Sequence, residues 1–431
     1  MLLEFTVGSY KSFYDNKTFS LQAQKLSEVN NDNIVNELQY NILKTMAVYG
    51  ANSSGKSNLI NALQSMKECV LYSVKLNAND LLSYEPFLLV KGNTKPTLFE
   101  VTFLKNSYCY RYGFAYNQTS IINEWLFRKT TPRSKEQTLF IRNTDGIAFE
   151  DKKFPEAIGL ESKVNDNRLF LSLCAQLGGE ISNQVISWFS NDLNIVSGLY
   201  NEIYRDFSYN LFHQKTKTSK NALDFFKKLQ LGFFDISTRE RIYAPPKDIQ
   251  DDYIDIYNKI NQMSTSPIIK RGTKQIEIES IHNLYDPKGN TCGSINFVFN
   301  DKESSGTRKL FDMSGPIFDA LEHGSILVID ELDAKMHPLI SQQIISLFNS
   351  QEHNPNNAQL IFTTHDTHLL STKMLRRDQI WFTEKNDMEQ TDLYCLTDIV
   401  LPDGSKPRND ANYEKNYIAG RYGAIPYIIN D

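Results

Sequence analysis

A glycine-bearing segment near the N-terminus constrains this chain more than any other feature. Residues 50–57 read Gly-Ala-Asn-Ser-Ser-Gly-Lys-Ser and fit the pattern G-x-x-x-x-G-K-[ST] at every position. The apolar run 45–49 before it predicts a strand, and apolar residues at helical spacing after Ser57 predict a helix. A strand, a loop and a helix in this order are the context in which the pattern is informative.

Each residue type in this segment suits the binding of a nucleotide. Glycines let backbone N–H groups wrap phosphate oxygens, Lys56 reaches the β- and γ-phosphates, and the Ser57 hydroxyl ligates Mg²⁺ at a helix N-terminus. The expected nucleotide-binding residues here are Gly50, Asn52, Ser53, Ser54, Gly55, Lys56 and Ser57.

A second motif ends in two neighbouring carboxylates. The continuous apolar run 326–329 has the composition of a strand buried on both faces of a parallel sheet. Asp330 follows it, where a carboxylate can hold Mg²⁺, and Glu331 comes next, where a second carboxylate can orient an attacking water. Alone, such a pair is more often a solvated strand end; together with residues 50–57, it indicates a hydrolysing enzyme.

Two further segments have donors for a phosphate. The strand-like run 360–363 leads to Thr364 and His365, and an imidazole at this position can bond a γ-phosphate. Residues 303–308 form a small turn rich in hydroxyl and N–H groups. Taken singly, His365 is more simply a half-buried histidine and the turn a surface turn.

Taken in order, the motifs resemble the ABC-type ATPase core of SMC, RecF and OLD proteins. The similarities are to the Walker A motif at 50–57, the ABC signature at 304–307, the Walker B pair at Asp330 and Glu331, the D-loop at 332–333 and the switch histidine at His365. The resemblance implies ATP hydrolysis with Mg²⁺. The implied catalytic residues are Lys56, Glu331 and His365, and the implied metal-binding residues are Ser57 and Asp330.

The same resemblance implies a homodimer or a higher homo-oligomer. In this family two heads enclose two nucleotides, so Ser305 and Gly306 of one chain would complete the nucleotide site of the other. Closure around ATP then works as a switch, because the γ-phosphate supplies contacts that hydrolysis removes.

Within this group the chain is most similar to stand-alone bacterial ATPases of abortive-infection and restriction-linked operons, called RloA-like. The similar segments are 10–13, 331–333, 337–338, 377–382 and 420–426. The signature departs from transporter cassettes, which have Leu-Ser-Gly-Gly-Gln where this chain has Ser-Ser-Gly-Thr, and this difference weakens a transporter interpretation. Residues 84–87 lack the glutamine of a Q-loop, and Lys11 is a weak candidate for a phosphate contact.

The expected fold is α/β: an ABC/SMC-type P-loop ATPase head, with a mixed sheet and flanking helices, that carries a mainly helical insertion. Further strand patterns lie over 3–13 and 295–299, and a hairpin is predicted for 97–103 and 108–116. Three parts are predicted, namely an N-terminal ATPase lobe at 1–160, the insertion at 161–285 and a C-terminal ATPase lobe at 286–431.

Composition limits the cellular location and the binding partners that we expect for this chain. A net charge of −5 provides no global positive field for nucleic acid or anionic lipid. The five cysteines are scattered without a Cys-x-x-Cys, which argues against a disulfide framework or a zinc site. No signal peptide is evident, and no apolar run approaches the roughly 18 residues of a membrane span. We expect a reduced, cytoplasmic protein that does not associate with membranes.

The preferred functional hypothesis is a slow ATPase that acts as a switch or scaffold subunit of a bacterial anti-phage, abortive-infection system. It would control a separately encoded toxin or nuclease, either RloB-like or of the TOPRIM class, and would contact nucleic acid through that complex. The chain after His365 contains no Asp-x-Asp, so no nuclease of its own is expected. The acids in this part are expected in a solvated loop, and they are Asp398, Asp403 and Asp410.

Three alternatives remain open at this point. One is an SMC- or RecF-like DNA repair ATPase that clamps DNA directly through a basic patch in the insertion. Its candidate residues are Lys215, Lys217, Lys220, Lys270, Arg271 and Lys274. The others are the ATP-binding subunit of a transporter and a degenerate scaffold that does not hydrolyse ATP.

Overall fold

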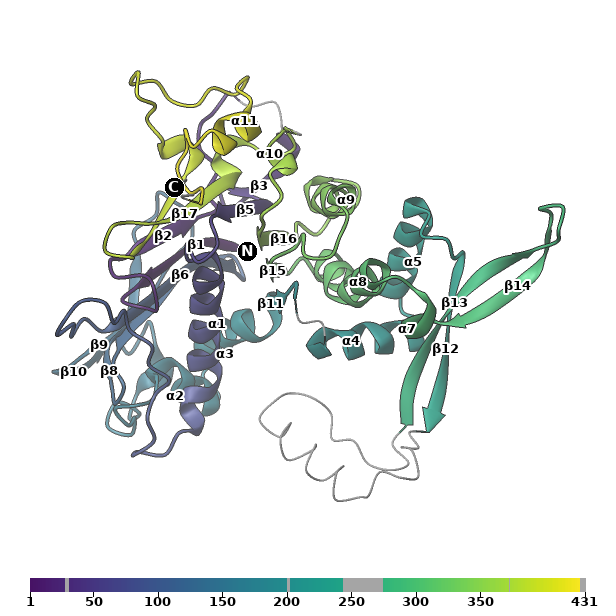
Figure 1. Ribbon diagram of the computed structural model, residues 1–431. Coiled ribbons are helices and arrows are strands. Elements are labelled where there is room, and N and C mark those ends of the chain that lie inside the picture. Colours follow the sequence, from purple (N-terminus) through teal and green to yellow (C-terminus); the bar gives the residue numbers. More distant parts are fainter. Residues whose placement is uncertain (28–30, 200–201, 243–273, 372, 427–431) are drawn as a thin grey trace. The chain divides into compact units, whose positions relative to one another are not determined.

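Two compact units make up the chain, and residues 1–27, 31–199, 202–242, 274–371 and 373–426 of it are described by the computed structural model (Figure 1). The first unit comprises Met1–Ile195, His323–Leu332 and Gln342–Asp431. The second comprises Val196–Glu322 and Asp333–Ser341. Within the described residues, no helix combines the length and the apolar character that crossing a bilayer requires.

An antiparallel sheet of seven strands forms one layer of the first unit. In spatial order the strands are β10 (Gly146–Phe149), β9 (Gln137–Asn143), β8 (Ile121–Lys129), β7 (Tyr108–Tyr116), β6 (Thr97–Lys105), β1 (Leu2–Gly8) and β2 (Lys17–Ser20). The predicted hairpin is confirmed, because β6 and β7 pair antiparallel around the turn at Asn106 and Ser107. Alternate residues of β6 are buried, as expected for a strand with one face on the core.

The strand predicted over 3–13 is shorter in the structure. It ends at Gly8, and Tyr10 and Phe13 then close a tight turn through reciprocal backbone hydrogen bonds of 2.8 Å. Ser9 and Lys11 have φ angles of 44° and 46°, which interrupt the extended backbone. Apolar residues continue through this turn at Tyr10 and Phe13, so the pattern alone extended the predicted strand too far.

A second sheet of six strands carries the buried parallel strands. In spatial order they are β11 (Leu193–Ser197), β15 (Ile326–Asp330), β16 (Gln359–Thr363), β5 (Thr45–Gly50), β17 (Ile380–Lys385) and β18 (Thr391–Cys395). The pairs β15–β16, β16–β5 and β5–β17 are parallel, and β18 is antiparallel to β17. All residues of β5 and β16 are buried, which explains why these strands are apolar without alternation. The strands predicted at 45–49 and 326–329 are thus confirmed.

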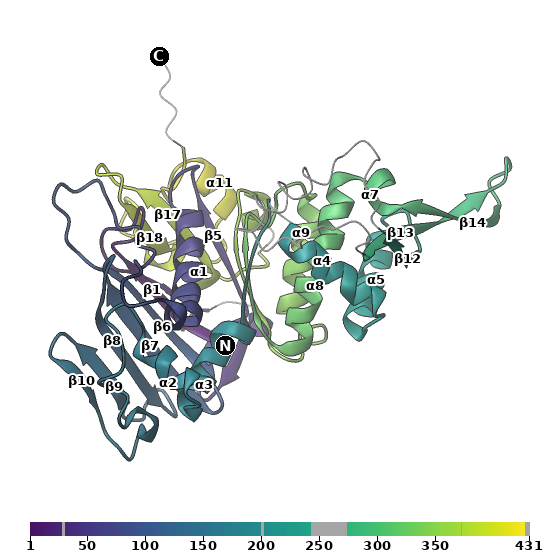
Figure 2. The same ribbon diagram turned by 90° about the horizontal axis from the view of Figure 1, so that it is seen from below.

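Helix α1 (Lys56–Tyr72) contacts strands of both sheets, namely β1 and β6 of the antiparallel sheet and β5 and β15 of the other (Figure 2). Its buried face carries Leu59, Leu63 and Met66 at helical spacing, as predicted. The buried Gln359 side chain adds a polar link between the sheets, because its amide accepts from the Leu2 N–H at 2.6 Å and donates to the Leu2 carbonyl at 3.0 Å.

The chain also has two short strands and several other helices. They are β3 (Ile34–Glu37), β4 (Tyr40–Leu43), α2 (Phe170–Gln176), α3 (Glu180–Ser187), α9 (Pro338–Asn349), α10 (His368–Ser371) and α11 (Tyr413–Ile418). Glu124 of β8 is fully buried and caps α2, because its carboxylate accepts from the N–H groups of Phe170 and Leu171 at 2.7 and 3.0 Å.

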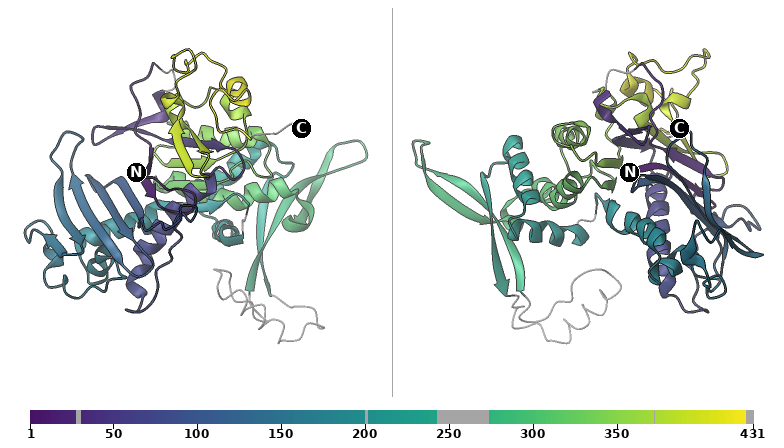
Figure 3. Two further views of the ribbon diagram at one scale, coloured as in Figure 1. Left: turned by 60° about the vertical axis from the view of Figure 1, so that its left-hand side comes forward. Right: turned by 180° about the vertical axis from the view of Figure 1, so that it is seen from behind.

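The second unit combines helices with a three-stranded antiparallel sheet. Its elements are α4 (Glu202–His213), α5 (Lys217–Leu229), β12 (Asp235–Ile242), β13 (Lys274–Tyr285), β14 (Thr291–Val298), α7 (Phe299–Lys302) and α8 (Ser305–His323). Aromatic side chains from four elements meet in its core, where the rings of Phe212 and Phe299 lie 4.6 and 4.7 Å from that of Phe311. The tip of the β13–β14 hairpin extends beyond the helices of this unit (Figure 3).

One strand predicted for this region differs from the structure. The strand predicted over 295–299 ends at Val298, because Phe299 begins α7 and buries its ring in the aromatic core. The range 161–285, predicted to be mainly helical, contains helices α2 to α5 but also strands β11, β12 and β13. The α/β class is confirmed, while the division at 160 and 285 stays a prediction.

Candidate functional site

The glycine-bearing loop connects the buried strand β5 to helix α1. The strand ends at Gly50, and Gly55 caps the helix with a φ of 114°, in the left-handed region that favours glycine. A Cβ atom at Gly55 would overlap the Thr391 side chain, so the close packing also requires a glycine here. Ser53 has a φ of 64° and is exposed, as is Asn52.

The Lys56 side chain folds back onto this loop. Its ammonium nitrogen donates to the carbonyl oxygens of Gly50 at 2.8 Å and Ala51 at 3.1 Å, and the residue is only 5% exposed. These two bonds hold the ammonium against the loop. Ser57 follows in the first turn of α1 and is half-buried.

Two threonines support the loop from the neighbouring strands β17 and β18. The hydroxyls of Ser54 and Thr383 lie 2.6 Å apart, and the Thr391 hydroxyl lies 2.8 Å from the Ser54 carbonyl oxygen and 2.7 Å from the Ser12 hydroxyl. Sequence reasoning missed Thr383 and Thr391, because no motif marks them and their role depends on strand pairing across more than half the chain.

The predicted carboxylate pair lies at the end of strand β15. Asp330 is the last residue of the strand and is half-buried, and Glu331 follows with a φ of 59°. Thr363, the last residue of β16, holds both: its hydroxyl donates to Asp330 Oδ1 at 2.7 Å and accepts from the Glu331 N–H at 2.7 Å. The Thr363 carbonyl oxygen also accepts from the Leu332 N–H at 3.1 Å.

Residues Thr364 and His365 continue from the same strand. Thr364 is fully buried, and its N–H donates to the Val48 carbonyl oxygen of β5 at 3.1 Å. The Thr364 hydroxyl accepts from the Asp366 N–H at 2.9 Å and so bends the chain around His365, which is exposed.

The strand order brings these residues to one edge of the six-stranded sheet. Because β15, β16 and β5 are parallel neighbours, their carboxyl ends meet there, with Thr363 between Asp330 on one side and Gly50 on the other. A hydroxyl at Ser57 and a carboxylate at Asp330 are hard oxygen donors that suit Mg²⁺, which usually keeps further positions for phosphate and water oxygens. This set therefore fits a magnesium-bound nucleotide.

The signature-like segment lies in the second unit, at the start of the 19-residue helix α8. The Ser304 hydroxyl accepts from the Thr307 N–H at 3.1 Å and thereby caps the helix. Ser304 and Ser305 are exposed, and a Cβ atom at Gly306 would lie 3.0 Å from the Lys335 carbonyl oxygen.

A half-buried polar cluster lies directly before this segment. The Glu303 carboxylate accepts from the Ser280 hydroxyl at 2.6 Å and lies 2.9 Å from His282 Nε2. Ser280 is fully buried on β13, so the cluster ties the start of α8 to the three-stranded sheet. Nothing in the sequence pattern indicates this link.

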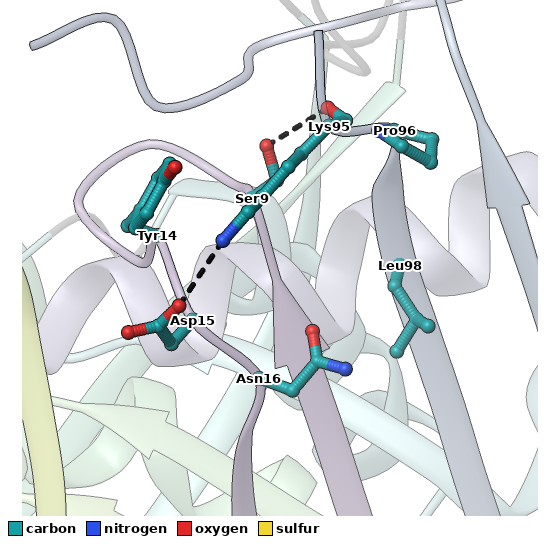
Figure 4. Close-up of a pocket in the computed structure, with 7 residues that line it drawn as sticks. All are labelled: Ser9, Tyr14, Asp15, Asn16, Lys95, Pro96 and Leu98. Atoms are coloured by element: carbon teal, nitrogen blue, oxygen red, sulfur yellow. Dashed lines mark hydrogen bonds and ion pairs between the residues drawn. The ribbon is translucent and has the colours of Figure 1, made fainter. Parts of the chain in front are cut away.

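A separate surface hollow of about 370 Å³ lies beside the turn that follows β1. Figure 4 shows Lys95 reaching across it, with its ammonium 3.1 Å from Asp15 and 3.5 Å from the centre of the Tyr14 ring. Lys11, the candidate for a phosphate contact, pairs with Glu85 at 3.4 Å, and its contact with a phosphate stays a prediction.

The charged clusters named in the sequence have ordinary surroundings. Lys215, just before α5, and Lys217 and Lys220, within it, are exposed. Lys274 begins β13, and Lys270 and Arg271 lie outside the described residues. Asp403 accepts from Ser405 and Asp410 pairs with Arg408 at 2.8 Å. Among the residues the structure describes, no group of three or more His, Cys, Asp or Glu side chains is arranged to hold a metal.

One family of known proteins matches most of the chain. Its description is "AAA domain, putative AbiEii toxin, Type IV TA system", and the match covers residues 46–371. The matched range includes the loop at 50–57, the signature-like segment, the Asp330–Glu331 pair and His365. No curated protein matches the chain.

Proposed function

The chain belongs to the family described as AAA domain, putative AbiEii toxin, type IV toxin–antitoxin system, and from this premise we propose that it is a slow ATPase working as a switch in anti-phage defence. The family relation supports a P-loop ATPase connected with abortive infection. The finer parts of the proposal are an ABC/SMC-type head, a homodimer closed by ATP, and a separately encoded toxin or nuclease under its control.

One observation carries the enzymatic part of this proposal. The loop after β5 and the carboxylate pair after β15 end at the same sheet edge, separated by the single strand β16 that leads to His365. Elements distant in sequence thus supply a phosphate loop, a metal-holding carboxylate and a second carboxylate to one place. Hydrolysis of a nucleotide needs these three groups together.

Each residue then has a distinct task. The Lys56 ammonium neutralises the β- and γ-phosphates, and the Glu331 carboxylate orients the attacking water and accepts its proton. The His365 imidazole bonds the γ-phosphate. Mg²⁺ would be held by the Ser57 hydroxyl and the Asp330 carboxylate. It would draw charge from the phosphate oxygens and so favour release of the γ-phosphate from the β-phosphate.

The exposed start of α8 supports the proposed dimer. Ser305 and Gly306 lie at the N-terminus of a long helix, where free N–H groups and the helix dipole favour an anion. In our proposal these donors reach the γ-phosphate bound by a second copy of the chain. The closed dimer would then last until hydrolysis, and the activity of the effector would depend on how long the dimer stays closed.

Phosphate release tests the enzymatic part. Wild-type protein should release phosphate from ATP only with Mg²⁺, and Glu331→Gln should reduce the rate by at least about 100-fold. Glu352→Gln, in an exposed turn, is the matched control and should keep full activity. Wild-type protein without Mg²⁺-dependent release would remove the ATPase proposal.

A mixing experiment tests the shared site. Lys56→Ala and Ser305→Arg proteins should each be inactive, but a mixed dimer contains one site with an intact loop from one chain and an intact signature from the other. Activity should therefore return on mixing. Its continued absence, in mixtures shown by tag pull-down to contain both chains, would contradict a site shared between chains.

The effector is identified by capture. Tagged Glu331→Gln protein, expressed in the native host, should hold the closed state longest and retain its partner. Mass spectrometry should then find one operon-encoded protein with toxin- or nuclease-like chemistry. Recovery of DNA and repair proteins instead would favour the alternative of a clamp that binds DNA directly.

The exposed lysines at the start of α5 are the observation behind that alternative. A direct clamp predicts that the isolated chain binds plain duplex DNA with an affinity that falls steeply with salt. Replacing Lys215, Lys217 and Lys220 with glutamine should then weaken binding and flatten the salt dependence. A switch that acts through its effector predicts no such binding.

A further inference from the structure

Thr363 occupies a position that no motif of the sequence assigns. It is the last residue of β16, fully buried, between the strand that ends at Asp330 and the strand that ends at Gly50. Its hydroxyl is 2.7 Å from Asp330 Oδ1 and 2.7 Å from the Glu331 backbone nitrogen. One side chain therefore contacts both members of the carboxylate pair.

The chemistry of the three groups fixes the direction of these hydrogen bonds. A backbone N–H can only donate, so the Thr363 oxygen accepts from Glu331. An ionised carboxylate can only accept, so the single Thr363 hydroxyl hydrogen goes to Asp330 Oδ1. This bond leaves Oδ2 as the oxygen without a contact to Thr363, and it restrains the position of the carboxylate.

The second hydrogen bond controls the backbone of Glu331. This residue has a φ of 59°, a left-handed conformation that residues with a Cβ atom rarely adopt. Bonds from Glu331 and Leu332 to the hydroxyl and the carbonyl oxygen of Thr363 hold the turn in this form. The direction in which the Glu331 carboxylate leaves the sheet is set by the same turn.

We propose that Thr363 is a positioning residue, whose hydroxyl orients Asp330 toward Mg²⁺ and Glu331 toward the attacking water. The inference rests on the proposed ATPase function and adds a residue to it. Groups that hold a metal ligand in place typically contribute 10- to 100-fold to metal affinity or activity. Because Thr363 precedes Thr364 and His365 directly, movement of the histidine segment would also be felt by the carboxylate pair.

The chain offers a close control in Thr45, at the opposite end of the neighbouring strand β5. Thr45 is also fully buried, and its hydroxyl donates to Asn349 Oδ1 at 2.9 Å and accepts from Gln379 Nε2 at 2.6 Å. Thr45→Val therefore removes the same two kinds of hydrogen bond as Thr363→Val, away from the carboxylate pair. Both variants lose one donated and one accepted hydrogen bond at a fully buried position.

The test measures nucleotide binding as well as turnover. Binding of mant-ADP is followed by fluorescence in EDTA and as a function of Mg²⁺ concentration, and phosphate release is measured with ATP at saturating Mg²⁺. Thr363→Val should bind mant-ADP normally in EDTA. It should need about tenfold more Mg²⁺ to reach the Mg²⁺-dependent change in mant-ADP binding, and it should hydrolyse ATP at least about tenfold more slowly. Thr363→Ser should restore both properties, and Thr45→Val should leave both unchanged.

Every outcome decides the proposal. If Thr363→Val does not fold, Thr363→Ala and Thr363→Ser provide the comparison, because they differ by the hydroxyl oxygen alone. A hydroxyl-free variant with wild-type Mg²⁺ dependence and turnover would overturn the role of Thr363 while leaving the ATPase intact. A wild-type protein without Mg²⁺-dependent nucleotide binding or phosphate release would instead contradict the proposed function itself.

Discussion

The Lys56 ammonium nitrogen lies 2.8 Å from the carbonyl oxygen of Gly50, the last residue of the strand that precedes its own loop. A second hydrogen bond, to the Ala51 carbonyl oxygen, keeps the side chain curled over the loop. The loop thus orients the ammonium before any phosphate contact forms, and a bound phosphate must offer it a stronger partner than two carbonyl groups. A phosphate oxygen does so, because its negative charge attracts the ammonium more strongly than a neutral carbonyl oxygen does.

Replacing this lysine should separate nucleotide binding from folding. Lys56→Ala should weaken binding of mant-ATP by about 1.5–3 kcal/mol, the usual contribution of a hydrogen bond to a charged group, and should stop phosphate release. The control is Lys75→Ala, which removes an ammonium over the Tyr72 ring at the far end of α1. Equal nucleotide affinity in the two variants, by fluorescence titration, would contradict the assigned role.

The glycine before Lys56 allows a second prediction, about stability. Gly55→Ala places a Cβ at a φ of 114° and against Thr391, whereas Gly146→Ala has a comparable φ of 137° and no atom within 4 Å of the new Cβ. Gly146→Ala should cost about 1–2 kcal/mol of unfolding free energy from backbone strain alone. Gly55→Ala should cost more and should also abolish nucleotide binding. Urea denaturation measures both costs, and equal values would show that Thr391 yields without penalty.

Local sequence patterns predicted those elements whose signals lie within one continuous stretch of the chain. The strand, loop and helix around 50–57 and the hairpin over 97–116 were predictable because their spacing and turn residues are contiguous. The apolar run before Asp330 was predictable for the same reason. The turn after Gly8 was not, because apolar residues continue through it at Tyr10 and Phe13 while Ser9 and Lys11 adopt positive φ angles.

The supporting residues of the site were out of reach for a different reason. Thr363, Thr383 and Thr391 matter only because β16, β17 and β18 lie near β5 in the sheet, an order set by pairings between residues more than 300 positions apart. A threonine in a strand has no distinguishing signal of its own, since its β-branched side chain favours strands anyway. Strand order therefore determines which ordinary residues become functional.

The cluster before the signature-like segment gives a third prediction. Glu303→Ala removes the acceptor of Ser280 and His282 and should loosen the start of α8. If Ser305 acts in the partner's site, ATP-dependent dimerisation of the Glu331→Gln protein should weaken by about tenfold, while mant-ATP binding by the monomer stays unchanged. Glu277→Ala, which breaks ion pairs to Arg239 and Arg241 on the same sheet, is the control. Light scattering with and without ATP measures dimerisation, and an equal effect of the two variants would remove the link to the signature.

The last prediction concerns Lys44, whose side chain is fully buried and whose ammonium nitrogen has no hydrogen-bond partner among the described residues. Burial lowers the pKa of Lys44 below the ordinary 10.5, and attraction to Asp32 opposes this shift only in part. An unpartnered buried polar group destabilises a fold by about 1–3 kcal/mol. Lys44→Met fills the same space without the amine and should therefore raise the unfolding free energy at pH 7.

The pH dependence of that gain has a definite sign. Between the lowered pKa of the folded state and 10.5, the unfolded chain binds more protons at Lys44 than the folded chain does, so wild-type stability rises with pH through this window. The gain from Lys44→Met should accordingly be largest at pH 7 and shrink as the pH approaches 10.5. Urea denaturation of both proteins at several pH values measures the difference, in which titrations of other groups cancel. Lys67→Met is the control: burial also lowers the pKa of Lys67, but its ammonium donates to the Leu193 carbonyl oxygen at 2.6 Å, so its removal should not stabilise the protein. A gain from Lys44→Met that does not change with pH would show that packing, and not the buried amine, sets the stability at this position.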